Sequence, residues 1–307
     1  AHMTSEKKIS PQQLFSVLLL AELTAEVVYP QSASGYSGEA VLAVIIAEVI
    51  RFVLALPVII YSFKGSAFYA ASYRKNKFFG WICAVGAALL LVGAACRTLM
   101  YSAEFTQQCI IAGTSSALIF VISAAFAIYA AYMGIEAQAR TGVLLLVAAG
   151  IITLIIVIAD IPYMRFPEMH TRRGAYNGLI ADILSRVLHG GDYLIFAAFL
   201  PYVRAEKGNV GRTALFFSLF STLGTLFLCV FGMVTLRELY ALTKYPFAAA
   251  ASLSDISLFK RLDGIGCAVW SLCAALRAGI MFFSAYAVIE EITNCLRVKH
   301  KSKEAGA

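Results

Sequence analysis

Long apolar runs separated by short polar segments dominate the sequence. A helix needs about 20 predominantly apolar residues to cross the hydrocarbon core of a bilayer. The runs therefore predict a single all-α transmembrane domain, residues 9–296, with eight spanning helices. Their approximate ranges are 11–29, 39–63, 78–102, 108–133, 141–160, 176–204, 211–235 and 262–293.

Two of the eight runs carry ionisable residues near their middle. The first run contains Glu22 and Glu26, which are four residues apart and so share one helical face. The sixth run contains the segment 189–192, in which His189 and Asp192 flank two glycines. Paired glycines beside ionisable groups indicate a helix that unwinds toward a cavity. The sixth run comes five helices after the first. This offset predicts an inverted repeat, with broken helices one and six meeting at a midplane site.

Composition confirms that the bilayer is the solvent. The chain is 60% hydrophobic and 14% charged with a mean hydropathy of +0.79, whereas soluble domains average roughly 45–50% apolar and about 25% charged residues. In such a protein the net charge of +7 indicates cytoplasmic loops and anionic lipid rather than nucleic acid. The distribution of Lys and Arg predicts that both termini are cytoplasmic. We expect residues 1–8 to be an N-terminal tail, with 1–3 an expression remnant, and 297–307 to be a basic tail.

No pattern in the sequence points to an enzyme. The seven cysteines include no Cys-x-x-Cys pair, and they are predicted to be small buried residues rather than disulfides or metal ligands. There is no His-Glu-x-x-His, Gly-x-Ser-x-Gly or Walker motif. We therefore predict no catalytic residue, no metal and no cofactor.

Ionisable residues inside spanning helices pair with one another or serve function. Glu48 and Arg51 are three residues apart, and Asp182 and Arg186 are four apart, so each pair can form an ion pair on one helix. His189 lies on the face of Asp182, and either a structural or a ligand-binding role fits it. Three further residues have no local partner and are expected to find one on another helix or to lie near an interface: Arg97, Glu104 and Arg277. For Arg277, a ligand carboxylate and an internal carboxylate such as Glu22 or Glu26 both remain open.

Several stretches, in order along nearly the whole chain, resemble one known family. They are Ile9–Phe15, Arg97–Phe105, Gly134–Thr141, Leu200–Tyr202, Leu242–Phe247, Arg261–Asp263 and Trp270. They are similar to the B subunit of bacterial spore germinant receptors, the endospore germination permease branch of the amino acid–polyamine–organocation (APC) transporters.

This resemblance implies a LeuT-like fold of ten helices in the spore inner membrane. Because the sequence supplies eight runs, we expect the second repeat to be truncated. The implied partners are a larger membrane subunit, a lipoprotein subunit and a small germinant, often an amino acid, bound between helices one, three, six and eight. The binding residues that the resemblance implies are Thr24, Ala25, Thr98, Tyr101, Gly190, Gly191 and Arg277. The charged candidates near them are Glu22, Glu26, Arg97, Asp182, Arg186, His189 and Asp192.

Three functions fit these observations. The first is a receptor subunit that binds a small nutrient and signals to partner subunits. The second is an ion-coupled amino-acid transporter, and the third is an assembly subunit that binds no ligand. For an amino acid, backbone N–H groups at a broken helix would hold the carboxylate, and Glu22, Glu26 or Asp192 would hold the ammonium.

Overall fold

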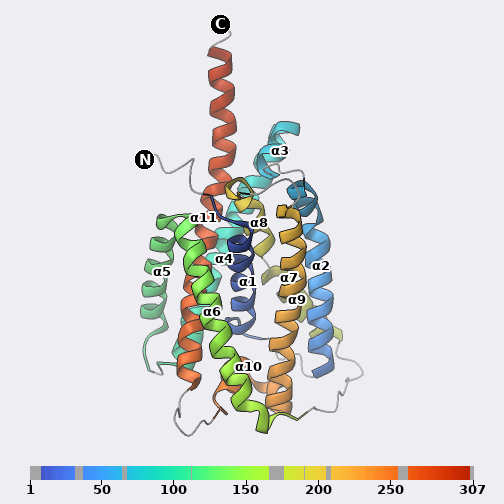
Figure 1. Cartoon of the computed structure of the whole chain (residues 1–307), viewed down its shortest axis with the longest axis vertical. Coiled ribbons are helices and arrows are strands. Elements are labelled where there is room, and N and C mark those ends of the chain that lie inside the picture. Colours follow the sequence, from blue (N-terminus) through green and yellow to red (C-terminus); the bar gives the residue numbers. More distant parts are fainter. Residues whose placement is uncertain are drawn as a thin grey trace.

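The computed structural model describes residues 8–31, 37–63, 68–111, 113–165, 176–189, 191–204, 209–254 and 262–304. Within these ranges the fold is helical, and the only β-type pairing there is an isolated bridge between Ile9 and Val203. The helices form one elongated bundle in which the start of α1 and the C-terminal end of α11 lie at the same end (Figure 1).

The first half of the chain forms α1 (Pro11–Val28), α2 (Ser37–Phe63), α3 (Phe68–Lys75), α4 (Lys77–Cys109), α5 (Ser116–Met133), α6 (Ile135–Asp160) and η1 (Ile161–Tyr163). The second half forms α7 (Tyr176–His189), α8 (Asp192–Phe199), η2 (Leu200–Tyr202), α9 (Asn209–Leu236), η3 (Arg237–Leu242), α10 (Pro246–Ala251) and α11 (Leu262–Glu304).

Within the described ranges, seven segments are long and apolar enough to cross a membrane, and they match seven of the eight predicted runs. They are Glu39–Phe63, Lys77–Cys109, Ser116–Met133, Ile135–Tyr163, Gly178–Tyr202, Asn209–Leu242 and Asp263–Cys295. The remaining predicted run is α1, which carries Glu22 and Glu26 and lies in the interior of the bundle (Figure 1). Because α1 is covered by other helices, its composition is not constrained by contact with lipid tails.

The predicted break in helix one is wrong, since α1 runs without interruption through Thr24 and Ala25. Ser10 caps its start, with Pro11 in the first turn. The helix ends at Val28 because Tyr29 precedes Pro30, and a residue before proline is driven out of the helical region; Tyr29 has an extended ψ of 140°. In the sixth run α7 ends at His189 and α8 begins at Asp192, on either side of the predicted break. The inverted repeat itself stays a prediction.

The longest helix, α11, has 43 residues and is about 65 Å long at 1.5 Å per residue. It packs along α4, α5 and α6 and then projects beyond the bundle (Figure 1). The predicted eighth span therefore continues as a helix to Glu304, into the segment that we expected to be a separate basic tail.

The junction at residues 134–141 ties α5 and α6 to α11. Gly134 ends α5 and starts α6 with a φ of 84°, a conformation that favours glycine. Gln138 donates from one amide nitrogen to the carbonyl of Ala130 at 2.9 Å and to that of Gly279 at 3.2 Å. A Cβ at Gly279 would lie 2.8 Å from the carbonyl oxygen of Ala127. Glycine is therefore needed at this contact between α5 and α11.

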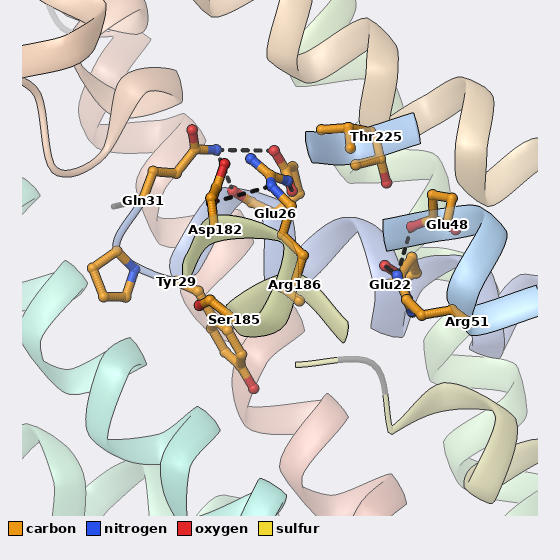
Figure 2. Close-up of a pocket in the computed structure, with 13 residues that line it drawn as sticks. Glu22, Glu26, Tyr29, Gln31, Glu48, Arg51, Asp182, Ser185, Arg186 and Thr225 are labelled. Carbon is orange, nitrogen blue, oxygen red and sulfur yellow. Dashed lines mark hydrogen bonds and ion pairs between the residues drawn. The ribbon is translucent and has the colours of Figure 1, made fainter. Parts of the chain in front are cut away.

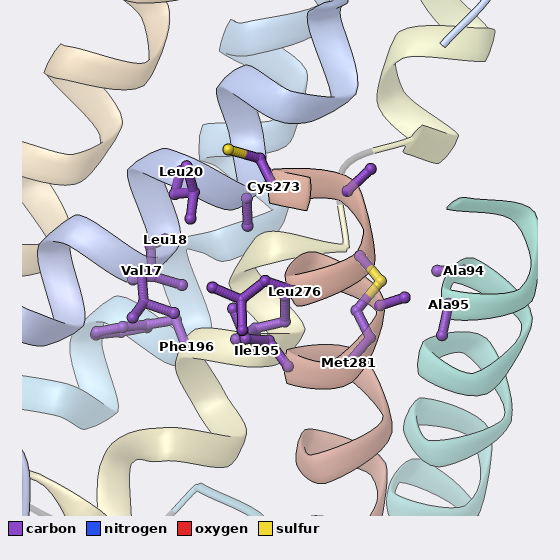
Figure 3. Close-up of a cluster of buried hydrophobic side chains, with 14 of the residues drawn as sticks. Val17, Leu18, Leu20, Ala94, Ala95, Ile195, Phe196, Cys273, Leu276 and Met281 are labelled. Atoms are coloured by element: carbon purple, nitrogen blue, oxygen red, sulfur yellow. The ribbon is translucent and has the colours of Figure 1, made fainter. Parts of the chain in front are cut away.

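The apolar core lies where α1, α4, α8 and α11 meet (Figure 3). The first helix contributes Leu18 and Leu20, while α8 contributes Ile195 and Phe196, all fully buried. This core packs α1 against α8, the two helices that carry the buried carboxylates Glu22 and Asp192.

Candidate functional site

Arg51, on α2, is the centre of a buried ion-pair cluster. Its two terminal nitrogens bind both carboxylate oxygens of Glu22 on α1. One of them also donates to Glu48 at 2.6 Å, and the other lies 3.4 Å from Asp192. These four side chains are at most 7% exposed. Because a charge in a low-dielectric interior is costly unless it is paired, these contacts fix how α1, α2 and α8 pack.

Arg277, on α11, extends the Arg51 cluster. Its guanidinium is fully buried, donates to the backbone carbonyl of Ala21 at 2.5 Å, and lies 3.5 Å from Asp192. Three carboxylates, on Glu22, Glu48 and Asp192, therefore face two guanidiniums. This surplus of one carboxylate can be balanced by a proton or by a bound cation.

A second cluster joins α1 to α7. Arg186 donates to Glu26 at 2.7 Å, and its Nε lies 3.5 Å from Asp182. Gln31 donates to the other oxygen of Glu26 at 2.9 Å and accepts from Tyr240 at 2.7 Å. Two carboxylates, on Glu26 and Asp182, thus share the guanidinium of Arg186, and these three side chains with Gln31 are called the Arg186 cluster.

The two clusters border a small polar cavity of about 40 Å³. Its lining comes from α1, α2, α7, α9 and the segment after α1 (Figure 2). The lining residues are Glu22, Ala25, Glu26, Tyr29, Pro30, Gln31, Val44, Glu48, Arg51, Asp182, Ser185, Arg186 and Thr225. A buried water needs about 10–15 Å³ of such volume, so the cavity has room for about three waters.

Tyr29 connects the cavity to α4 and α11. Its hydroxyl lies 2.6 Å from that of Thr98, and its ring packs against Tyr101 with centroids 5.0 Å apart. The guanidiniums of Arg97 and Arg277 lie 5.9 and 5.3 Å from the ring centroid, in cation–π range. Tyr29, which lines the cavity, therefore also contacts residues of α4 and α11.

The gap between α7 and α8 restricts the residue type at position 191 less than the paired glycines indicated. Gly191 caps α8 with a φ of −82° and a ψ of 0°, which other residues adopt readily. A Cβ at Gly191 would meet Met281 at 3.5 Å and Ala94 at 4.0 Å, which are ordinary contacts. The structure therefore does not require glycine at position 191, and Gly190 lies outside the described residues.

Comparison with known protein families decides what this bundle belongs to. The family model for spore germination proteins, named spore permease, matches residues 8–303. That range is nearly the whole chain. The chain belongs to the spore germination protein family. No curated protein matches it. The family is one of permease-type membrane proteins and is not a known enzyme family.

In this spore germination protein the predicted site residues fall into two groups. Five of them line the cavity: Glu22, Ala25, Glu26, Asp182 and Arg186. Six others lie around it without lining it: Thr24, Arg97, Thr98, Tyr101, Asp192 and Arg277. Thr24 donates to the carbonyl of Leu20 within its own helix, at 2.6 Å. Gly191 lies at the α7–α8 gap, and the side chain of His189 and all of Gly190 lie outside the described residues.

The residues without a local partner all find one on another element, as expected. Arg97 donates to the carbonyl of Leu188 at 2.8 Å. Glu104 pairs with Lys244, and Arg277 pairs with Asp192 rather than with Glu22 or Glu26.

Sequence reasoning missed the central position of Arg51 and the roles of Tyr29 and Gln31. Arg51 was predicted to pair with Glu48, and that pair is confirmed. Nothing in its spacing predicted the contacts with Glu22 and Asp192, which come from other helices. For Tyr29 and Gln31 the available signal was Pro30, because a proline cannot continue a helix and so marks where α1 ends.

Proposed function

We propose that this spore germination protein is the membrane subunit of a germinant receptor in the spore inner membrane. In this proposal it binds a small nutrient of the amino-acid class at the cavity. The observation that carries the proposal is the ion pair between Glu26 and Arg186, which is about 10% exposed and lies in the cavity wall. These two groups are the partners that the ammonium and the carboxylate of an amino acid need.

A zwitterion can replace this internal ion pair without changing the net charge of the site. Its carboxylate would take two hydrogen bonds from Arg186, a geometry that guanidinium groups favour. Its ammonium would bind Glu26 and Asp182, the two carboxylates that share Arg186. Gln31, which already donates to Glu26, would keep that carboxylate oriented.

Binding must widen the cavity. Small-molecule sites typically enclose about 300–1,000 Å³, far more than the present 40 Å³. Separating Arg186 from Glu26 would move α7 away from α1, and α7 ends at the gap before Asp192. The ligand would thereby favour an open form, by no more than its difference in affinity for the two forms. The larger membrane subunit and the lipoprotein subunit would respond to that form.

The test is thermal stability of the detergent-purified protein against a panel of L-amino acids and small polyamines. A ligand at 100 times its dissociation constant stabilises the folded state by about 2.7 kcal/mol. We expect one or a few amino acids to raise the melting temperature of the wild type. Glu26→Gln should abolish this shift, because a neutral amide binds an ammonium weakly.

Glu136→Gln is the matched control, since Glu136 pairs with Arg140 on a partly exposed face of α6. It should keep the ligand-induced shift. The absence of a shift with every compound, or a shift that survives in Glu26→Gln, would contradict the proposed site. Accumulation of a stabilising amino acid inside proteoliposomes would instead favour the transporter.

A further inference from the structure

The register between α4 and α11 brings two cysteines together at one end of the bundle. Thr98 contacts the sulfur of Met281, and Thr106 lies 2.8 Å from Ser271, so the two helices run antiparallel. One turn further along both helices are Cys109 and Cys267. This register places the two side chains at the same level of the contact between α4 and α11.

Both cysteines line a second pocket, of about 300 Å³. It lies beside α10, at the end of the bundle opposite to the start of α1 (Figure 1). Lys244 and Asp263 lie in its wall. Cys109 is partly exposed and Cys267 is 1% exposed. A small solute that enters the pocket therefore reaches Cys109 first.

We propose that Cys109 and Cys267 form a reversible disulfide that links α4 to α11. The oxidant is a small-molecule disulfide of the glutathione class. The Cys109 thiolate attacks one sulfur of the oxidant, and a mixed disulfide forms as the first small thiol leaves. Cys267 then attacks the Cys109 sulfur and releases the second small thiol. The protein loses two electrons and two protons, and the oxidant is reduced to two thiols.

The position of this pair distinguishes it from the other five cysteines. All seven cysteines lie in the described ranges and are free thiols. Among these described residues, Cys109 and Cys267 are the two cysteines that line this pocket. The pocket lies at the end that we predict to face away from the cytoplasm, where disulfides persist. The link would restrain α4, which carries Thr98 and Tyr101, and α11, which carries Arg277. The inference does not depend on the proposed ligand, because it rests on the two cysteines and their pocket alone.

The experiment treats the purified full chain with oxidised glutathione and then alkylates the remaining thiols. We expect two of the seven thiols to resist alkylation and dithiothreitol to restore them. Trypsin should yield residues 98–140, which contain Cys109 alone, joined to residues 262–277. Because the second peptide also contains Cys273, the variants Cys267→Ser and Cys273→Ser assign the link. The link should disappear in the first and persist in the second.

A further digest of the wild type keeps the proposal testable even if a variant does not fold. Chymotryptic cleavage after Trp270 separates Cys267 from Cys273, so the linked peptide identifies its own cysteine. Seven alkylated thiols after oxidation, or a link from Cys109 to Cys273, would overturn the proposal.

Discussion

Replacing Arg51 by methionine tests whether the buried charges hold the bundle together. Methionine keeps much of the side-chain volume but leaves Glu22 and Glu48 without their guanidinium, whereas Asp192 keeps Arg277. Removing one partner of a buried ion pair costs about 3–5 kcal/mol, because the remaining charge is buried and unpaired. We therefore expect Arg51→Met to lower the free energy of unfolding by about 3 kcal/mol or more, roughly 100-fold in the equilibrium constant.

The assay is reversible unfolding in mixed micelles of a mild detergent and dodecyl sulfate, followed by tryptophan fluorescence. Trp270 is 2% exposed and reports on the core. The matched control is Arg140→Met, which breaks an ion pair between Arg140, 71% exposed, and Glu136. Exposed pairs contribute about 0–1 kcal/mol.

The double variant with Glu22→Gln makes the test specific. It should recover part of the loss seen in Arg51→Met, because the amide removes one of the two stranded charges. If Arg51→Met costs no more than Arg140→Met, or if the double variant is less stable than Arg51→Met, the cluster does not stabilise the fold as argued.

Three further predictions concern single contacts. Gly279→Ala should destabilise the protein by about 1–3 kcal/mol, because its Cβ would clash with a backbone carbonyl 2.8 Å away; Gly150→Ala, with nothing within 4 Å, should be neutral or stabilising in the same melting experiment. Gly191→Ala should leave melting temperature and ligand response within error of the wild type, and a lost response would show that glycine itself is required there. Tyr29→Phe should cost about 1 kcal/mol, since it removes the hydroxyl that meets Thr98 and keeps the ring; an unchanged unfolding free energy would refute this.

The spanning helices could be predicted because apolar run length is a direct physical requirement of the bilayer. The end of α1 was predicted within one residue, and α7 and α8 lie on either side of the predicted break before Asp192. The predicted break in α1 failed because two carboxylates on one face do not unwind a helix when arginines on neighbouring helices neutralise them. The junction between α5 and α6 is shorter than expected, since α6 starts at Ile135, and α4 continues past its predicted end to Cys109.

The candidate site was predictable only where its contacts are local. Glu48 with Arg51 and Asp182 with Arg186 followed from helical spacing, and both pairs are present. The pairs that join helices, from Glu22 to Arg51 and from Glu26 to Arg186, depend on how α1 packs against α2 and α7. One sequence carries no direct record of that packing.

The small volume of the cavity has a consequence for the nutrient concentration to which the proposed receptor responds. A ligand that can enter only an open form binds with an apparent dissociation constant equal to the intrinsic one divided by the open fraction. If about one molecule in 100 is open, the apparent constant is about 100-fold weaker. The ion pair between Glu26 and Arg186 would then set a minimum nutrient concentration for the response. Traces of nutrient would leave the protein closed, and only a sustained supply would open it.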